Sequence, residues 1–361
     1  MHSQPITCAA LVTQLRRQHT TSARMVLCFG HCKVSVTANR NEMIAALGEY
    51  FAPFVSREGP ADIEIMAIES TDLHLPLDYT IKPPDPGKAK IKEEYVDLED
   101  GRVVRKRLTG MVFLFGQGYH LAIGPCMENL NQVINFINNR YIEWLLCRGC
   151  LLGHAAGVTL NGRGLAFAGF SGAGKSTLAL QVMNKGAVFV SNDRLLVEKR
   201  ADGPVMHGVA KMPRINPGTA LNNPHLQRIM SVDEQERFLE LDEEALWEIE
   251  HKYDAPIADC YGPGRFVLSA PMNGLVLLNW RRAAGPLEVE QVSLNERRDL
   301  LPAFMKSVGL FFMPGGACRM PEPTENAYID FLSACPTWEF RGGIDFESAA
   351  LTCVALCAHA R

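Results

Sequence analysis

The sequence predicts an α/β fold of two domains, a small α+β domain over residues 1–125 and a larger α/β domain over 126–361 with its core at 150–280. A glycine-rich loop lies between a short apolar run and a helix-forming segment. Segments that alternate around short turns precede this loop, and a strong helical period at 130–145 marks the boundary. A chain of 361 residues is long enough to bury both cores.

The composition is that of a globular protein, with 47% apolar and 21% charged residues. A net charge of −4 argues against a nucleic-acid-binding protein, because phosphate contacts need an excess of basic side chains. No apolar run approaches the ~20 residues of a membrane helix, and the N-terminus lacks the charged segment of a signal peptide. We therefore expect a cytoplasmic protein that binds neither nucleic acid nor membrane.

The chain has eleven cysteines, which we expect to be reduced, buried thiols. One alternative is a zinc site. The pairs Cys28/Cys32 and Cys147/Cys150, together with His31, would supply its ligands if they met in space.

In the first domain, residues 25–37 are expected to form two short strands. The segment 41–51 has the spacing of an amphipathic helix. Residues 81–90 are rich in proline, glycine and lysine, as a loop is. Residues 94–108 alternate around Asp100-Gly101, which predicts a hairpin.

In the second domain, residues 154–169 alternate around Asn161-Gly162 and predict a hairpin that leads into the loop. Ser231 and Ser293 each precede a glutamate by three residues, so both are expected to cap helices. The other expected elements are a helix at 176–185, strands at 187–191 and 274–280, and final helices at 324–334 and 345–359.

The loop from Gly169 to Ser176 fits the pattern G-x-x-x-x-G-K-[ST]. In this pattern backbone N–H groups surround phosphate oxygens, the lysine binds the β and γ phosphates, and the hydroxyl is a ligand of Mg²⁺. The expected nucleotide-binding residues are Gly169, Ser171, Gly172, Ala173, Gly174, Lys175, Ser176 and Thr177. ATP and Mg²⁺ are the expected cofactors.

Two further residues are expected beside this loop. Asp193 follows the strand at 187–191, where it could bind the metal or take a proton from a nucleophile. If Leu160 pairs with Arg163 or Gly164 in the hairpin, the register puts His154 opposite Gly169 or Phe170. No such register places His207 or His225 beside the loop, so we expect both to be structural.

Together these features resemble the HPr kinase/phosphorylase family, and in particular its HPr-kinase-related B-type subgroup, whose fold is related to phosphoenolpyruvate carboxykinase. His154 and Asp193 stand at the family's intervals from Lys175. The segment 262–273 resembles the family's P-G-R segment. The resemblance covers roughly residues 150–280. Thr177 stands where the family usually has glutamate, Asn192 replaces the first of its paired aspartates, and its E-[IL]-R-G signature is missing from 207–221.

The resemblance implies catalytic roles for four residues. Asp193 would be the general base and a metal ligand with Ser176, and Lys175 would hold the phosphates. His154 would support the loop, and Arg265 would neutralise the transferred charge. The expected activity is ATP-dependent transfer of a γ-phosphoryl group to a serine or threonine of a partner protein. A homo-oligomer is expected by analogy.

Three alternatives remain open at this point. The same residues would serve a kinase that acts on a small hydroxy acid, such as a hydroxy amino acid. The loop could also belong to a nucleotide-binding regulatory module without transfer chemistry. A carboxykinase-like decarboxylation would need further metal and carboxylate ligands that the sequence does not supply.

Overall fold

The computed structural model describes residues 6–57, 59–84, 89–249, 251–282, 284–313, 315 and 318–358, and it is a mixed α/β structure with two large sheets. The chain forms two compact units. The first comprises Met1–Arg148 and Val308–Arg319, and the second comprises Gly149–Ser307 and Met320–Arg361. The predicted boundary at 125/126 therefore differs from the observed one, because the long helix after it packs on the sheet of the first unit.

In the described part of the first unit, nine strands form one sheet: β1 (Ala23–Phe29), β2 (Cys32–Ala38), β3 (Val55–Ser56), β4 (Ile63–Glu69), β5 (Thr80–Ile81), β6 (Glu93–Leu98), β7 (Gly101–Lys106), β8 (Val112–Gly116) and β9 (Tyr119–Gly124). Their order is β3-β1-β2-β4-β9-β8-β7-β6-β5. The helices are α1 (Cys8–Gln18), α2 (Asn41–Tyr50), the short 3₁₀ helix η1 (Ala52–Phe54) and α3 (Leu130–Leu146).

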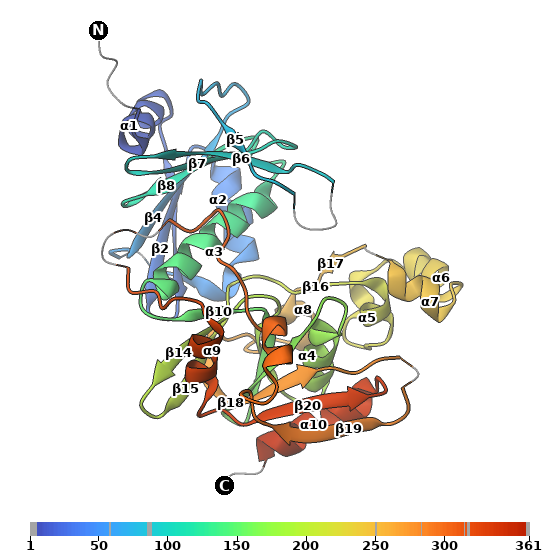
Figure 1. Cartoon of the computed structure of the whole chain (residues 1–361). Coiled ribbons are helices and arrows are strands. Elements are labelled where there is room, and N and C mark those ends of the chain that lie inside the picture. Colours follow the sequence, from blue (N-terminus) through green and yellow to red (C-terminus); the bar gives the residue numbers. More distant parts are fainter. Residues whose placement is uncertain are drawn as a thin grey trace. The chain divides into compact units, whose positions relative to one another are not determined.

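The two faces of this sheet are covered by different helices, as Figure 1 shows. Successive side chains of a strand point to opposite faces. Val112 and Leu114 of β8 therefore join the core under α1, whereas Phe113 and Phe115 contact Phe136 of α3. Helices α2 and α3 lie side by side. The strands expected at 25–37, the helix at 41–51 and the hairpin at 94–108 are all confirmed, and residues 85–88 of the expected loop lie outside the described residues.

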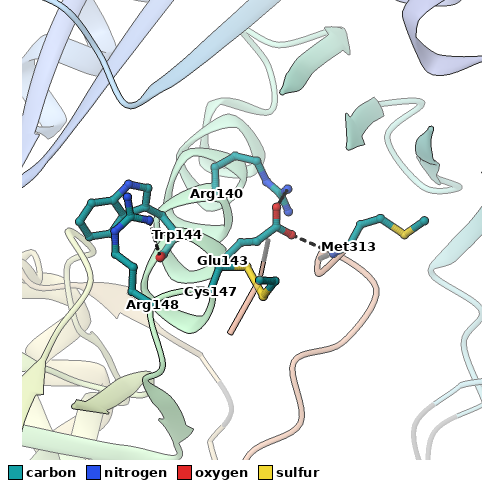
Figure 2. Close-up of a disulfide and its surroundings, with 7 residues drawn as sticks. Arg140, Glu143, Trp144, Cys147, Arg148 and Met313 are labelled. Carbon is teal, nitrogen blue, oxygen red and sulfur yellow. Dashed lines mark hydrogen bonds and ion pairs between the residues drawn. A yellow bond between two sulfur atoms is a disulfide. The ribbon is translucent and has the colours of Figure 1, made fainter. Parts of the chain in front are cut away.

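A segment from the C-terminal half of the chain, residues 308–319, belongs to the first unit. Arg140 of α3 is 1% exposed, forms an ion pair with Glu143 at 3.0 Å and donates a hydrogen bond to the Phe311 carbonyl. Glu143 accepts a hydrogen bond from Met313 N at 2.8 Å (Figure 2). These bonds satisfy two charges that would be costly to bury alone, and they attach the segment to α3.

A disulfide joins the same segment to the end of α3. Cys147 follows the helix and is bonded to Cys318, 171 positions later (Figure 2). The prediction of eleven reduced thiols is therefore wrong for these two residues, and the other nine cysteines are free. The disulfide also removes Cys147 as a zinc ligand, and no group of three or more metal-ligating side chains is found among the described residues, so the zinc alternative is wrong.

The second unit is built on another sheet. Its described strands are β10 (Leu151–Gly153), β11 (Ala155–Leu160), β12 (Arg163–Gly169), β13 (Val188–Ser191), β14 (Leu195–Arg200), β15 (Gly203–His207), β18 (Ser269–Leu278), β19 (Leu287–Val292) and β20 (Thr337–Gly342). The order is β10-β14-β15-β18-β12-β11-β13, and β20 pairs with both β18 and β19. A separate pair is β16 (Arg214–Ile215) with β17 (Tyr253–Asp254).

The described helices of this unit are α4 (Lys175–Asn184), α5 (Pro217–Leu221), η2 (Gln227–Ile229), α6 (Val232–Leu239), α7 (Glu243–Glu248), α8 (Ile257–Tyr261), η3 (Arg298–Ala303), α9 (Glu325–Leu332) and α10 (Phe346–Ala358). Phe167 of β12 packs with α4 and α10 on one face of the sheet. Its neighbours Ala166 and Ala168 pack with η3 and α9 on the other face, so both faces are buried.

Most expected elements of this unit are confirmed. The two-residue turn at Asn161-Gly162 has positive φ at both positions, which matches the twist of a tight hairpin. Ser231 forms the predicted capping box with Glu234. The helix expected at Ser293 is wrong, because Ser293 begins only a turn that precedes η3. Both final helices are present, and residue 359 lies outside the described residues.

None of the described helices combines the length and the apolar character that crossing a bilayer requires.

Candidate functional site

Three neighbouring strands bring the expected site residues to one edge of the second sheet. β11 is antiparallel to both β12 and β13, so its beginning lies at the same edge as their ends. His154 comes directly before β11, the glycine-rich loop follows β12, and Asp193 follows β13. Leu160 pairs with Arg163, and the same register places His154 opposite Gly169, as predicted.

The loop has the backbone that its glycines allow. Gly172 and Gly174 have φ of +80° and +84°, values that other residues adopt at a cost. Gly174 is the N-terminal cap of α4, and a Cβ at this position would lie 2.6 Å from the ring of Phe346. Both the backbone angle and the close packing require glycine here.

Lys175 lies at the start of α4 and is 8% exposed. Its ammonium group donates hydrogen bonds to the carbonyls of Gly169 at 2.7 Å and Phe170 at 3.3 Å. Burial lowers the pKa of Lys175 to about 8, with a further contribution from the charge of Lys306, while Asp193 opposes the shift. An anion beside this ammonium group would remove the penalty that burial imposes on it.

Asp193 is surrounded by positive or hydrogen-bonding groups. Its carboxylate lies 3.1 Å from His154 Nε2, 3.3 Å from Lys306 Nζ and 3.9 Å from Arg194 Nε. Burial alone would raise the pKa of Asp193, but the hydrogen bond from His154 and the charges of Lys306 and Arg194 hold it well below its usual range. Asp193 is therefore ionised at neutral pH.

Lys306 reaches Asp193 because its segment runs alongside the residues before β11. Met305 forms a β-bridge with Gly153, and His154 N donates to the Phe304 carbonyl at 2.6 Å. Sequence reasoning missed Lys306, which is 113 positions from Asp193 and carries no motif.

His154, Lys175, Asp193 and Arg194 line a cavity of about 1080 Å³, whose described lining does not include Lys306. It is lined by His154, the loop and the first turns of α4, the tip of β13, and residues around β16 and α5. Among the described lining residues one is acidic, Asp193, and six are basic: Lys175, Arg194, Lys211, Arg214, Lys252 and Arg282. Such a charge balance favours a polyanionic ligand.

Oxygen atoms for a divalent cation are present beside the loop. Ser176 and Asp193, the two predicted metal ligands, both line the cavity. Asn192 also lines it, and its buried amide oxygen has no hydrogen-bond partner among the described residues. Mg²⁺ is commonly held by one or two protein oxygens together with substrate phosphates, so this donor set fits it. Asn192 was noted in the sequence only as a departure from a pattern.

The other loop positions have structural partners. Thr177 Oγ1 lies 2.8 Å from Thr219 Oγ1, a hydrogen bond that joins α4 to α5. Trp280 Nε1 donates to the Ala173 carbonyl at 2.9 Å, and its ring packs against Phe346. Trp280 ends the run of the predicted strand at 274–280, and β18 is parallel to β12. Only the strand could be predicted from the sequence; its pairing with β12, which places Trp280 beside the loop, is seen in the structure.

Arg265 lies elsewhere. Its guanidinium donates to the carbonyls of Met183 and Ala187, at and just beyond the C-terminal end of α4. The loop is at the other end of this ten-residue helix, about 15 Å away. Arg265 is also not among the described residues that line the cavity. In the structure Arg265 thus satisfies a carbonyl in the last turn of α4 and another just beyond it.

No protein-family model matches the chain, and no curated protein is significantly similar to it. Among solved structures, the Hpr(Ser) kinase/phosphatase from Coxiella burnetii is similar to part of it, with 10% sequence identity. The alignment covers 57% of this chain and 93% of that chain, with a TM-score of 0.30. A TM-score at this level does not establish a shared fold.

Proposed function

We propose that the protein is an ATP-dependent kinase that transfers a γ-phosphoryl group to a serine or threonine hydroxyl of a partner protein. One observation carries this proposal. An ionised Asp193, bonded to His154, lines the same cavity as Lys175 and Ser176 of the loop. A phosphate-binding loop alone would serve any nucleotide-binding protein, whereas a carboxylate beside it can also accept a proton.

In this proposal each residue has one task. Lys175 and the N–H groups of the loop bind the β and γ phosphates, and Ser176, Asn192 and Asp193 offer oxygens to Mg²⁺. The bound nucleotide would supply the phosphoryl group: the acceptor oxygen bonds to Pγ, the bond to the bridging oxygen breaks, and nucleoside diphosphate leaves. Asp193 takes the acceptor's proton.

The low pKa of Asp193 in this structure has a consequence for that role. A carboxylate held by Lys306 and His154 is a weak base, and general bases work best with a pKa near the working pH. The charge of Lys306 and the hydrogen bond from His154 would have to weaken before Asp193 accepts the proton, because both lower its pKa.

A small-molecule acceptor is the second candidate, and the size of the cavity favours it. About 1080 Å³ is just above the range of roughly 300–1,000 Å³ for ligand pockets, which leaves room beside a nucleotide. Labelled γ-phosphoryl transfer into an extract that has been separated into macromolecules and metabolites distinguishes the two candidates. Label on a protein supports the first proposal. Label on metabolites alone would replace it with the second, and nucleotide binding without any transfer would contradict both.

A further inference from the structure

A half-buried lysine, Lys211, lines the cavity and belongs to the segment that follows β15. Gly208 packs so tightly against β13 that a Cβ there would lie 1.8 Å from the Val190 carbonyl oxygen. This close approach, which only glycine allows, carries the chain past the tip of β13. Lys211 follows three residues later and lines the same cavity as Asp193.

The ammonium group of Lys211 is half-buried and forms no hydrogen bond or ion pair with any described residue. Burial lowers the pKa of Lys211, and the charges of Arg194 and Arg214 lower it further, while those of Asp193 and Asp254 oppose the shift. Arg194 and Arg214 have acidic neighbours of their own, Asp193 at 3.9 Å and Asp254 at 3.3 Å. Lys211 thus has no ion pair of its own and shares the field of two carboxylates with two arginines, so a further anion would stabilise its partly desolvated charge.

The surroundings of Lys211 differ from those of Lys175, the lysine of the phosphate loop. The charges that act on Lys175 are those of Asp193 and Lys306. The charges that act on Lys211 are those of Arg194, Asp193, Arg214 and Asp254. Asp193 alone acts on both lysines, and all three residues line the same cavity.

We propose that Lys211, with Arg194 and Arg214 beside it, binds a carboxylate of the acceptor molecule, close to the hydroxyl that faces Asp193. This inference rests on the proposed kinase function and specifies its substrate class, a hydroxyl with a neighbouring carboxylate. A serine or threonine next to an acidic residue has this chemistry, and so does a free hydroxy acid. A lysine or arginine bonded to a carboxylate selects it strongly over a neutral isostere.

The experiment uses two matched pairs of probes and three forms of the full-length protein. One pair consists of peptides that differ only by aspartate or asparagine next to a serine, and the other is glycerate and glycerol. Wild type, Lys211→Met and Lys211→Arg are compared. Phosphoryl transfer to each probe is measured, as is the binding of each probe in the presence of Mg²⁺ and a non-hydrolysable ATP analogue. The affinity for the analogue is measured separately.

Wild type is expected to prefer the acidic member of one pair by about tenfold or more. Lys211→Met should abolish that preference, Lys211→Arg should keep it, and the affinity for the analogue should stay within about twofold. Intact analogue binding shows that Lys211→Met is folded. The pair that is preferred tells whether the carboxylate belongs to a peptide or to a free acid.

Two results would overturn the inference. The first is equal binding and phosphorylation of acidic and neutral probes by wild type. The second is weaker analogue binding by Lys211→Met with the preference intact, which would assign Lys211 to the nucleotide. If wild type transfers label to no acceptor but still binds the acidic probe through Lys211, the kinase proposal fails and the carboxylate site stands.

Discussion

His154 Nε2 lies 3.1 Å from Asp193 Oδ1, although one residue precedes β11 and the other follows β13. The antiparallel pairing of these two strands brings them together at the edge where the loop also begins. Because Asp193 is ionised, Nε2 donates the hydrogen bond. The imidazole thus orients the carboxylate, and Lys306 holds it from a different segment.

Replacing Lys175 with methionine should weaken nucleotide binding by one to two orders of magnitude, because its charge-assisted bonds to phosphate would be lost. Isothermal titration with Mg²⁺ and an ATP analogue measures the change. Lys185→Met is the matched control. Lys185 follows the other end of α4 and pairs with Glu347 on the surface, so its loss should leave the affinity unchanged. Equal effects of both variants would count against a phosphate site at Lys175.

Gly174→Ala should disrupt the loop more than Gly172→Ala. Both residues have positive φ, so each substitution carries a backbone cost of about 1–2 kcal/mol. At Gly174 the new Cβ would also meet the ring of Phe346, whereas nothing lies within 4 Å at Gly172. Chemical denaturation should show the larger loss of unfolding free energy for Gly174→Ala. When Phe346→Ala is added to Gly174→Ala, only the steric part of that loss should be relieved. A larger loss at Gly172 would contradict this packing.

The buried Lys175 should make the stability of the nucleotide-free protein depend on pH. Its pKa falls from 10.5 to about 8 on folding, so between these values the unfolded chain binds more protons than the folded one. Stability from this group therefore rises with pH across that window, by about 3 kcal/mol, and the cost is fully present below pH 8. Other groups also titrate here, so the quantity to measure is the difference between wild type and Lys175→Met in urea unfolding. A difference that does not change with pH would contradict the depressed pKa.

Removing the Cys147–Cys318 disulfide should destabilise the first unit, since the bond closes a loop across 171 positions. Cys147→Ser is expected to lower the free energy of unfolding by about 2–4 kcal/mol. Wild type in reductant should unfold like the variant, and the variant itself should not respond to reductant. Unfolding of wild type that is the same with and without reductant would show that the bond is not formed.

Local patterns in the sequence predicted much of the second unit. The Asn161-Gly162 turn fixes the register of β11 and β12, and that register alone places His154 opposite Gly169. The position of Asp193 after β13 could be predicted because a short helix and an apolar run directly follow the loop. In each case one short stretch of chain contains all the information.

Long-range features were not accessible in this way. Lys306 comes to Asp193 through the pairing of segments that are distant in sequence, and Lys211 lines the same cavity after the close packing of Gly208 on β13; no motif marks either lysine. Arg265 was assigned from a pattern of residues that carries no information about which helix end it reaches. The boundary and the disulfide depend on residues 308–319, whose return to the first unit has no local signal.

The most direct test of the central claim is γ-phosphoryl transfer by Asp193→Asn, measured together with nucleotide affinity. The account predicts that the transfer rate falls by two to four orders of magnitude, because the general base is removed. Nucleotide binding should be retained, because the phosphate-binding loop is unchanged. Asp202→Asn, on an exposed turn, should behave like wild type. Transfer at the wild-type rate by Asp193→Asn would contradict the account.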